Sequence, residues 1–291
     1  MHTRLILAAA LASVFCGCGE TTSKDPATAI AAGAGLCASY NFDRAAEHFA
    51  AARMLAPAGS EAWLQATFGL AVCRQQEVPI ELPRVAEAAA LFKEVVEKGG
   101  ASPLAAQACL NLGRIAELRD TSADTPDLEE ARRWYKQVVD TWPDAAIAGE
   151  ASLRMGVTWI QSLERKDVEA GIAILEARAA RPNEPWAGAL WKQAGDAWWV
   201  NLGDRANAVR CLGRCIEAGH PDPSRAALTV WRAAKLADES GDRDAALGFY
   251  RRIIERHPNS GMAWDAQQRM RELGVEPPPI KLAVMPEEKK A

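Results

Sequence analysis

The stretch SGDRDAALGFYRRIIERHPNSGMAW, residues 240–264, contains the pattern that decides the fold. Tyr250 and Ile253 stand four and seven residues after Ala246, and side chains at these offsets share one face of an α-helix. Pro258 follows this stripe and has no N–H with which to continue the helical hydrogen bonds. The stretch therefore predicts a helix whose apolar face ends before this proline.

The same pattern recurs along the chain and defines a repeat. A proline or glycine ends each copy, and successive terminators are about 37 to 43 residues apart, which is typical of helical repeats. Six units are therefore predicted. The terminators are Pro57, Gly100, Pro143, Pro182, Pro221 and Pro258. The stripes before the first five are Ala45, Phe49 and Ala52; Ala88, Phe92 and Val95; Ala131, Tyr135 and Val138; Ala170, Ile174 and Ala177; and Ala208, Leu212 and Cys215.

Each unit also contains an earlier helix, so the unit is a helix pair. Gly113 and Gly156 each follow a large apolar residue, and a glycine at such a position lets two helix backbones approach closely. Turn signals such as Gly241-Asp242 separate the two helices. Two longer polar insertions, RQQEVPIELPR at 74–84 and RDTSADTPDLEE at 119–130, account for the longer period of units two and three.

The order of Gly-Asp, Ala, Tyr or Phe, an aliphatic residue and Pro, with Trp264 opening the next helix, resembles the tetratricopeptide repeat over residues 26–274. The lines YRRIIERHPNSGMAWDAQQRM and YKQVVDTWPDAAIAGEASLRMG look most like repeats of bacterial envelope proteins: the lipoprotein partner of the β-barrel assembly machinery and the Tol-Pal coordinator protein. FKEVVEKGGASPLAAQACLNLG is similar to Sel1-like units, an alternative with the same kind of fold. The resemblance implies an all-α, right-handed solenoid of about six helix pairs, with residues 262–273 as a capping helix.

Composition is consistent with one elongated domain. The 291 residues include 34 basic and 38 acidic side chains, and the basic residues form no stripe, so no nucleic-acid partner is predicted. Apolar residues make up 49% of the chain, which suits helices that each bury one face.

The first 18 residues predict a secretory signal peptide with a lipobox-like end. Arg4 precedes an apolar run at 5–15 that is too short to span a bilayer. In the bacterial lipobox that this end resembles, a cysteine after a small residue receives the lipid, which indicates Cys18 as the lipidation site. Phe15 stands where that motif usually has leucine, so simple secretion and a buried or spanning first helix stay open as alternatives.

The chain is thus divided into four parts. Residues 1–18 form the signal and 19–25 a short polar tether, and 26–274 form the solenoid. Residues 275–291, with three consecutive prolines and a charged end, are predicted to be a disordered tail.

Residues with catalytic or metal-binding potential form no recognisable site in the sequence. The five cysteines beyond the signal have no CxxC spacing, and we expect Cys37, Cys73, Cys109, Cys211 and Cys215 to be small core residues. The histidines lack a neighbouring nucleophile of triad character, and no phosphate-binding glycine loop is present. The sequence predicts neither an enzyme nor a metal or cofactor site.

Ten tryptophans are the remaining feature. Trp159, Trp191 and Trp264 are expected at packing positions, whereas the adjacent Trp198 and Trp199 cannot both face one core of a helix. The family resemblance implies that the first helix of each unit lines the concave surface. The positions expected to point outward there are Trp63, Arg74, Leu110, Arg114, Glu117, Lys192, Asp196, Trp199, Trp231 and Lys235.

Together these features predict a non-enzymatic scaffold of the bacterial cell envelope. It would be lipid-anchored and face the periplasm, or be secreted or periplasmic, and would bind a protein or peptide segment in its concave groove. Three alternatives stay open. They are an envelope enzyme built on a helical solenoid, which would need a pair of acidic residues, a glycan- or peptide-binding module that uses exposed tryptophans, and a purely architectural spacer.

Overall fold

The computed structural model describes residues 25–118 and 125–282, and all regular secondary structure in these ranges is helical. The predicted signal peptide, with Cys18, and the end of the predicted tail lie outside the described residues. The helices are α1 Pro26–Ala38, α2 Phe42–Leu55, α3 Glu61–Gln76, α4 Leu82–Gly99, α5 Pro103–Glu117, α6 Leu128–Thr141, α7 Ala146–Ile160, α8 Arg165–Ala179, α9 Ala187–Val200, α10 Arg205–Ala218, the short 3-10 helix η1 Pro223–Arg225, α11 Ala226–Glu239, α12 Arg243–Arg256 and α13 Met262–Glu272.

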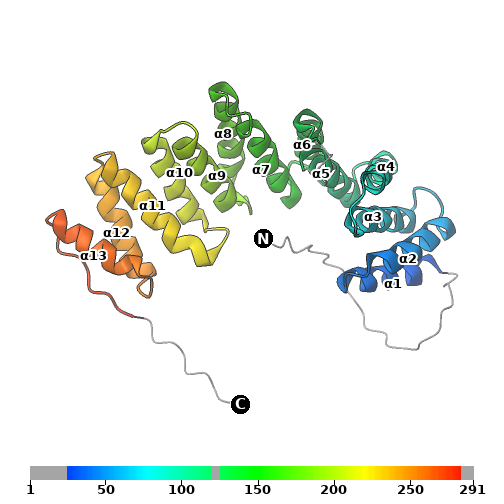
Figure 1. Cartoon of the computed structure of the whole chain (residues 1–291), viewed down its shortest axis with the longest axis horizontal. Coiled ribbons are helices and arrows are strands. Elements are labelled where there is room, and N and C mark those ends of the chain that lie inside the picture. Colours follow the sequence, from blue (N-terminus) through cyan, green and yellow to red (C-terminus); the bar gives the residue numbers. More distant parts are fainter. Residues whose placement is uncertain (1–24, 119–124, 283–291) are drawn as a thin grey trace, which may run out of the picture.

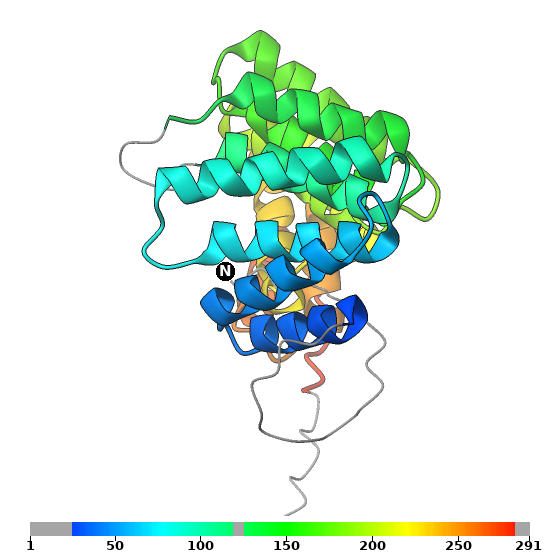
Figure 2. The same ribbon diagram turned by 90° about the vertical axis from the view of Figure 1, so that its right-hand side faces the viewer.

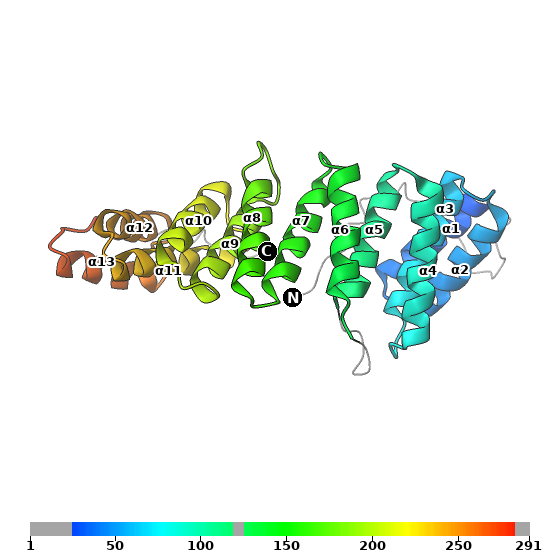
Figure 3. The ribbon, with the colours of Figure 1, turned by 90° about the horizontal axis from the view of Figure 1, so that it is seen from above.

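The helices stack as consecutive antiparallel pairs into an arch (Figure 1). Odd-numbered helices line the inner, concave side. There α1 contacts α3, α3 contacts α5, α5 contacts α7, α7 contacts α9, and α11 contacts α13. Seen from the N-terminal end, α1 and α2 form the first layer (Figure 2), and the view from above shows the pairs following one another along the long axis (Figure 3). The predicted right-handed solenoid of six pairs with a capping helix is confirmed.

Acidic caps begin the second helices of several units. The side chains of Asp127, Asp204 and Asp242 accept hydrogen bonds from the backbone N–H three residues later, at 2.9, 3.0 and 3.1 Å. Gly241 precedes the last of these caps with a φ of 80°, a left-handed conformation that glycine adopts without steric cost. The Gly-Asp turn signal therefore corresponds to a tight turn followed by a helix N-cap.

The apolar stripes of the second helices form the core in five of the six units. Those before Pro57, Gly100, Pro143, Pro221 and Pro258 are buried as predicted. In α8 the predicted register is wrong by one residue, because the side chains of Ala170 and Ala177 are exposed. There the core residues are Val168, Gly171, Ile172, Leu175 and Ala179. A helix rich in alanine offers two adjacent stripes of similar hydrophobicity, and contact with α7 selects between them.

The glycines in the first helices serve a different main purpose from the one predicted. A Cβ at Gly113 would lie 2.3 Å from Cε1 of Tyr135, the large stripe residue of α6. At Gly156 a Cβ would meet the Leu175 side chain at 2.6 Å, with the backbone oxygen of Gly171 at 3.1 Å. The glycines thus mainly receive a large side chain from the second helix, and close backbone approach is secondary.

The beginning of the predicted tail is packed, so that part of the prediction is wrong. Pro277 is buried, and Val275 and Ile280 pack against the core formed by α11, α12 and α13. The side-chain amide of Gln267 on α13 donates a 2.7 Å hydrogen bond to the carbonyl oxygen of Pro278. The segment covers part of the core next to α13, the last helix of the described residues, against which no later described repeat packs.

Among the described helices, none is both long enough and apolar enough to span a bilayer.

Candidate protein-binding surface

Arginine–carboxylate pairs connect consecutive odd-numbered helices on the concave side. Arg114 of α5 pairs with Glu150 of α7. Arg232 of α11 lies 3.0 Å from Asp196 of α9, and Arg269 of α13 lies 2.6 Å from Asp238 of α11. We call these three pairs the concave ladder. Because each pair joins neighbouring units, the ladder helps set their spacing. Arg114 and Asp196, which were expected to contact a partner protein, thus already form ion pairs within the chain.

Glu117 is buried rather than outward-facing, which corrects the prediction. Its side chain is 7% exposed and accepts hydrogen bonds from the Tyr135 hydroxyl at 2.6 Å and from Arg154 Nη1 at 3.1 Å. Arg154 also donates to Glu150 at 3.1 Å, which links this buried cluster to the Arg114–Glu150 rung. Glu117 therefore neutralises and satisfies groups between α5, α6 and α7.

Two buried tyrosines predict a loss of stability at alkaline pH. Burial, followed by the charge of the neighbouring carboxylate, raises the pKa of Tyr135 and of Tyr250, which lie beside Glu117 and Asp238. A folded-state pKa above the unfolded value of about 10 gives stability that is complete below that pH and is lost as the pH rises past it. Urea unfolding measured from about pH 9 to 11.5 should therefore show a falling free energy of unfolding above about pH 10.

Absorbance at the tyrosinate band provides the control for this prediction. The ring of Tyr40 is 83% exposed and serves as the solvent-accessible comparison. Tyr135 and Tyr250 should ionise only together with unfolding, detected in parallel by circular dichroism. Ionisation of all three tyrosines in the folded protein would contradict it.

Trp63 and Leu110 are also corrected, because both lie in the core. They are 7% and 4% exposed, and the Arg53 guanidinium from α2 lies 5.2 Å above the Trp63 ring. A first helix contacts its own second helix, the preceding second helix and the neighbouring first helices. Other helices therefore cover most of its circumference. Few of its residues are exposed, and the repeat register in the sequence does not show which ones.

The part of the concave surface on α9 and α11 retains accessible aromatic and charged groups. Lys192 and Asp196 pair at 2.6 Å, and the Arg232 guanidinium carbon lies 5.0 Å from the Trp199 ring centre. Lys235 is half-buried, and its charge contributes to the lowered pKa of the Asp238 carboxyl on the same helix. It is not within ion-pair distance of any carboxylate in 25–118 or 125–282. We call this set, Lys192, Asp196, Trp199, Arg232 and Lys235, the α9–α11 patch. It combines a partly exposed indole with a cation that has no ion-pair partner.

The two adjacent tryptophans were not expected to face one core, but both rings pack at the edge of the same cluster, formed by Ala208, Leu212, Ala233 and Leu236. Only their polar contacts differ. Trp198 donates from Nε1 to Glu176 of α8 at 2.8 Å, whereas Trp199 packs toward α11. Trp231 lies against Tyr250, with ring centres 5.6 Å apart, so its ring supports the last core. Trp264 was expected to pack but is 63% exposed at the start of α13, the last helix of the described residues.

The two remaining predicted concave residues lie away from this patch. Arg74, near the end of α3, pairs with Glu77 at 2.6 Å and with Glu87 of α4 at 3.1 Å. Arg114 is engaged in the concave ladder on α5. The structure thus brings Lys192, Asp196 and Trp199 together on α9, and it places Lys235 one turn along α11 from Arg232, which contacts both Asp196 and Trp199. The other predicted residues lie elsewhere.

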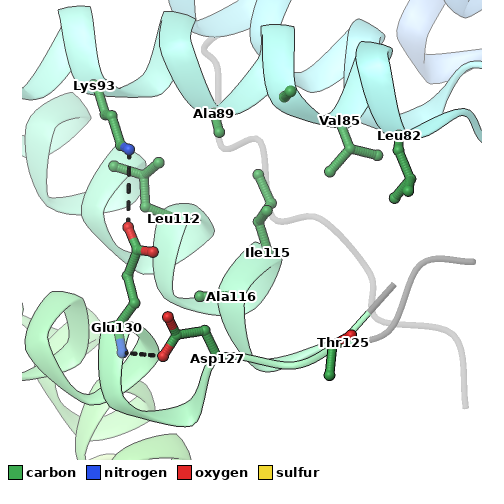
Figure 4. A pocket seen from close by; sticks show the side chains of 11 residues that line it. Leu82, Val85, Ala89, Lys93, Leu112, Ile115, Ala116, Thr125, Asp127 and Glu130 are labelled. Carbon is green, nitrogen blue, oxygen red and sulfur yellow. Dashed lines mark hydrogen bonds and ion pairs between the residues drawn. The ribbon is translucent and has the colours of Figure 1, made fainter. Parts of the chain in front are cut away.

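A pocket of about 300 Å³ between α4, α5 and α6 was not predicted as a site. Figure 4 shows Val85, Leu112 and Ile115 converging in it, with the 3.8 Å ion pair between Lys93 and Glu130 on one side. The two polar insertions border this pocket, and their interruption of the repeat was the signal in the sequence that could have indicated it.

Asp238 on the concave side is suited to pairing rather than to proton transfer. Hydrogen bonds from Arg269 hold the pKa of the Asp238 carboxyl below its usual range, and an ionised, paired carboxylate is a poor general acid near neutral pH. Within 25–118 and 125–282, no three His, Cys, Asp or Glu side chains converge in a way that could hold a metal ion.

Comparison with known proteins agrees with this architecture. Residues 81–146 and residues 229–260 match two family models, each described as "Tetratricopeptide repeat". The solved structure titled "Functional Characterization of Pseudomonas Aeruginosa pilF" is 16% identical, with a TM-score of 0.52 over 84% of this chain and 97% of that chain. A structure of the APC/C hetero-tetramer Cut9-Hcn1 is 15% identical, with a TM-score of 0.46 over 84% of this chain and 42% of that chain. No curated protein matches.

The repeat matches and the fold support a tetratricopeptide-repeat protein. Solenoids of this kind present extended concave surfaces on which other proteins bind, and they are generally non-catalytic. A protein-interaction scaffold is therefore the supported general function.

Proposed function

We propose that this chain is a non-enzymatic scaffold of the bacterial cell envelope that binds a segment of a partner protein along its concave surface. The observation that carries the proposal is the α9–α11 patch, where Lys235 has no ion pair in the described residues and Trp199 remains partly exposed. A partner segment would place an apolar side chain on the indole and an acidic group at Lys235.

The concave ladder supports this mode of binding. Since the surface is held by the pairs Arg232–Asp196 and Arg269–Asp238, it is already ordered before a partner arrives. A preformed surface loses less conformational entropy on association, so fewer favourable contacts are needed for a given affinity.

The envelope location rests on the first 18 residues of the sequence. Cleavage before Cys18 and its lipidation would anchor the chain in a membrane and place the solenoid in the periplasm; cleavage without lipidation would leave it secreted or periplasmic. Metabolic labelling with a radioactive fatty acid would distinguish the two, because only the lipidated form retains label, and Cys18→Ser would lose it.

Charge reversal at Lys235 tests the groove. In crosslinking and affinity capture from intact cells, Lys235→Glu should reduce recovery of the wild-type partner, and its affinity in a binding assay should fall about tenfold, or about 1.4 kcal/mol. The substitution leaves the Trp199 and Trp231 packing intact, so it tests the surface without removing a core aromatic.

Lys166→Glu is the matched control, because Lys166 is exposed on α8, an outer helix, and undergoes the same change in charge. It should capture the partner as the wild type does. Equal capture by both variants would reject the concave groove, and equal loss in both would indicate a general charge effect instead of a site.

A further inference from the structure

Two cysteines from different repeats meet near the N-terminal end of the solenoid. Cys37 lies near the end of α1 and Cys73 near the end of α3, and their Sγ atoms are 3.6 Å apart. The helices that carry them contact each other directly. Cys37 is half-buried and Cys73 is buried, so Cys37 is the more accessible residue of the pair.

The other described cysteines lack this arrangement. Cys109, Cys211 and Cys215 are fully buried, and within the described residues none of their sulfurs contacts another. The Cys211 thiol donates instead to Glu176 at 3.2 Å. The prediction that the five cysteines are small core residues is confirmed for these three and for Cys73, and Cys37 packs partly buried against the same core as Cys73. The prediction did not include the contact between the Cys37 and Cys73 sulfurs.

We propose that Cys37 and Cys73 are a disulfide-forming pair that clips the first two repeats together when the chain meets a disulfide oxidant. The oxidant is a disulfide of low molecular mass or of a thiol oxidoreductase. The Cys37 thiolate attacks one oxidant sulfur and releases the other as a thiolate; Cys73 then loses its proton, attacks Cys37 Sγ and releases the second oxidant thiolate. The chain loses two thiol protons and two electrons, and the oxidant disulfide is reduced to two thiols.

The geometry assigns the order of these steps. Cys37 is the more accessible residue of the pair, and the hydrogen bond from Cys73 lowers the pKa of its thiol, which favours the nucleophilic thiolate. That hydrogen bond and burial raise the pKa of the Cys73 thiol. Cys73 therefore acts second, when its target is the adjacent Cys37 sulfur. The two sulfurs, 3.6 Å apart on helices that contact each other, would approach to a disulfide bond of about 2.05 Å by rotation of the side chains.

The disulfide would form at the end of the solenoid where a helix has few neighbouring helices to hold it in place. The helix α1 contacts only α2 and α3, since no described repeat precedes it. A disulfide across about 36 residues restricts the unfolded chain and so favours the folded arrangement of these units. This consequence does not depend on what the concave surface binds.

Peptide mapping of the full chain tests the proposal. The purified protein is incubated with oxidised glutathione, its remaining thiols are blocked with N-ethylmaleimide, and it is digested with trypsin without reduction. The expected product joins the peptides of residues 25–44 and 54–74, at a mass two hydrogens below their sum. A reducing agent should separate them, and oxidation should raise the melting temperature by about 5 °C.

Two serine variants make the result specific. Cys37→Ser should abolish both the joined peptide and the rise in melting temperature, whereas Cys215→Ser, the control on α10, should retain both. Circular dichroism checks that each variant is folded, and the wild-type peptide map stands even if a variant is not. Glutathione retained on Cys37 without a joined peptide, or joined peptides that involve other cysteines equally, would overturn the proposal.

Discussion

Replacement of Gly113 by alanine is expected to destabilise the protein by about 3 kcal/mol, the upper part of the usual range for overpacking a core. The new Cβ would lie 2.3 Å from Cε1 and 2.8 Å from Cζ of Tyr135. That ring cannot easily move, because it is fully buried and its hydroxyl is held by Glu117 at 2.6 Å. Alanine is the better helix former by about 1 kcal/mol, which offsets only part of the cost. Urea unfolding measures the difference.

Gly248→Ala is the matched control, because Gly248 also lies within a helix but a Cβ there would meet no atom within 4 Å. It should stabilise the protein by about 0.5 to 1 kcal/mol, through helix propensity alone. If the two variants have equal free energies of unfolding, the Tyr135 ring adapts to the added methyl group, and the tight fit of glycine and ring is not a constraint on the fold.

The repeat was predictable because its signals are local. Pro258 and its counterparts end helices through a missing N–H, and the stripe typified by Ala246 and Tyr250 repeats at helical offsets, so both can be read without knowledge of the neighbours. The predicted register of α8 was wrong because such local signals contain no information about the neighbouring helix. Ala170 and Gly171 are both small, and only the packing against α7 determines which of them is buried.

The candidate site was less predictable because it depends on partners distant in sequence. The repeat register placed Glu117 and Trp63 at outward positions of the first helices, but contacts from other helices bury both. Arg232 was absent from the predicted surface, although its pairing with Asp196 and its position over Trp199 order the patch. Its spacing of 36 residues from Asp196, close to the repeat length, was the available signal.

The packed segment after α13 was missed for a similar reason. Its consecutive prolines exclude a helix, and their composition suggested disorder. Instead, the side chains of Val275 and Ile280 pack against the last core, and the Gln267 side chain donates a hydrogen bond to the backbone of the segment. A segment without regular hydrogen bonding can therefore still serve as the cover that the end of a solenoid needs.

Replacement of Glu117 by alanine is expected to cost about 3 to 5 kcal/mol, the range for removing one partner of a buried charge pair. The variant would leave the Tyr135 hydroxyl without its acceptor and Arg154 without one of its carboxylates, and the Glu117 side chain it removes is only 7% exposed. Glutamine at this position keeps an acceptor for Tyr135 but not the charge beside Arg154, so Glu117→Gln should be intermediate. Urea unfolding of the three proteins gives the order.

Glu169→Ala is the control for this series, since Glu169 pairs with Arg165 on the outer helix α8 and both side chains are largely exposed. It should cost less than about 1 kcal/mol. A loss at Glu117 no larger than this would mean that its carboxylate is solvated, as the sequence first indicated. A large loss would mean that reduced partner binding by a Glu117 variant reflects unfolding of the α5–α7 region. Groove binding must therefore be tested at Lys235, which forms no ion pair within the described residues.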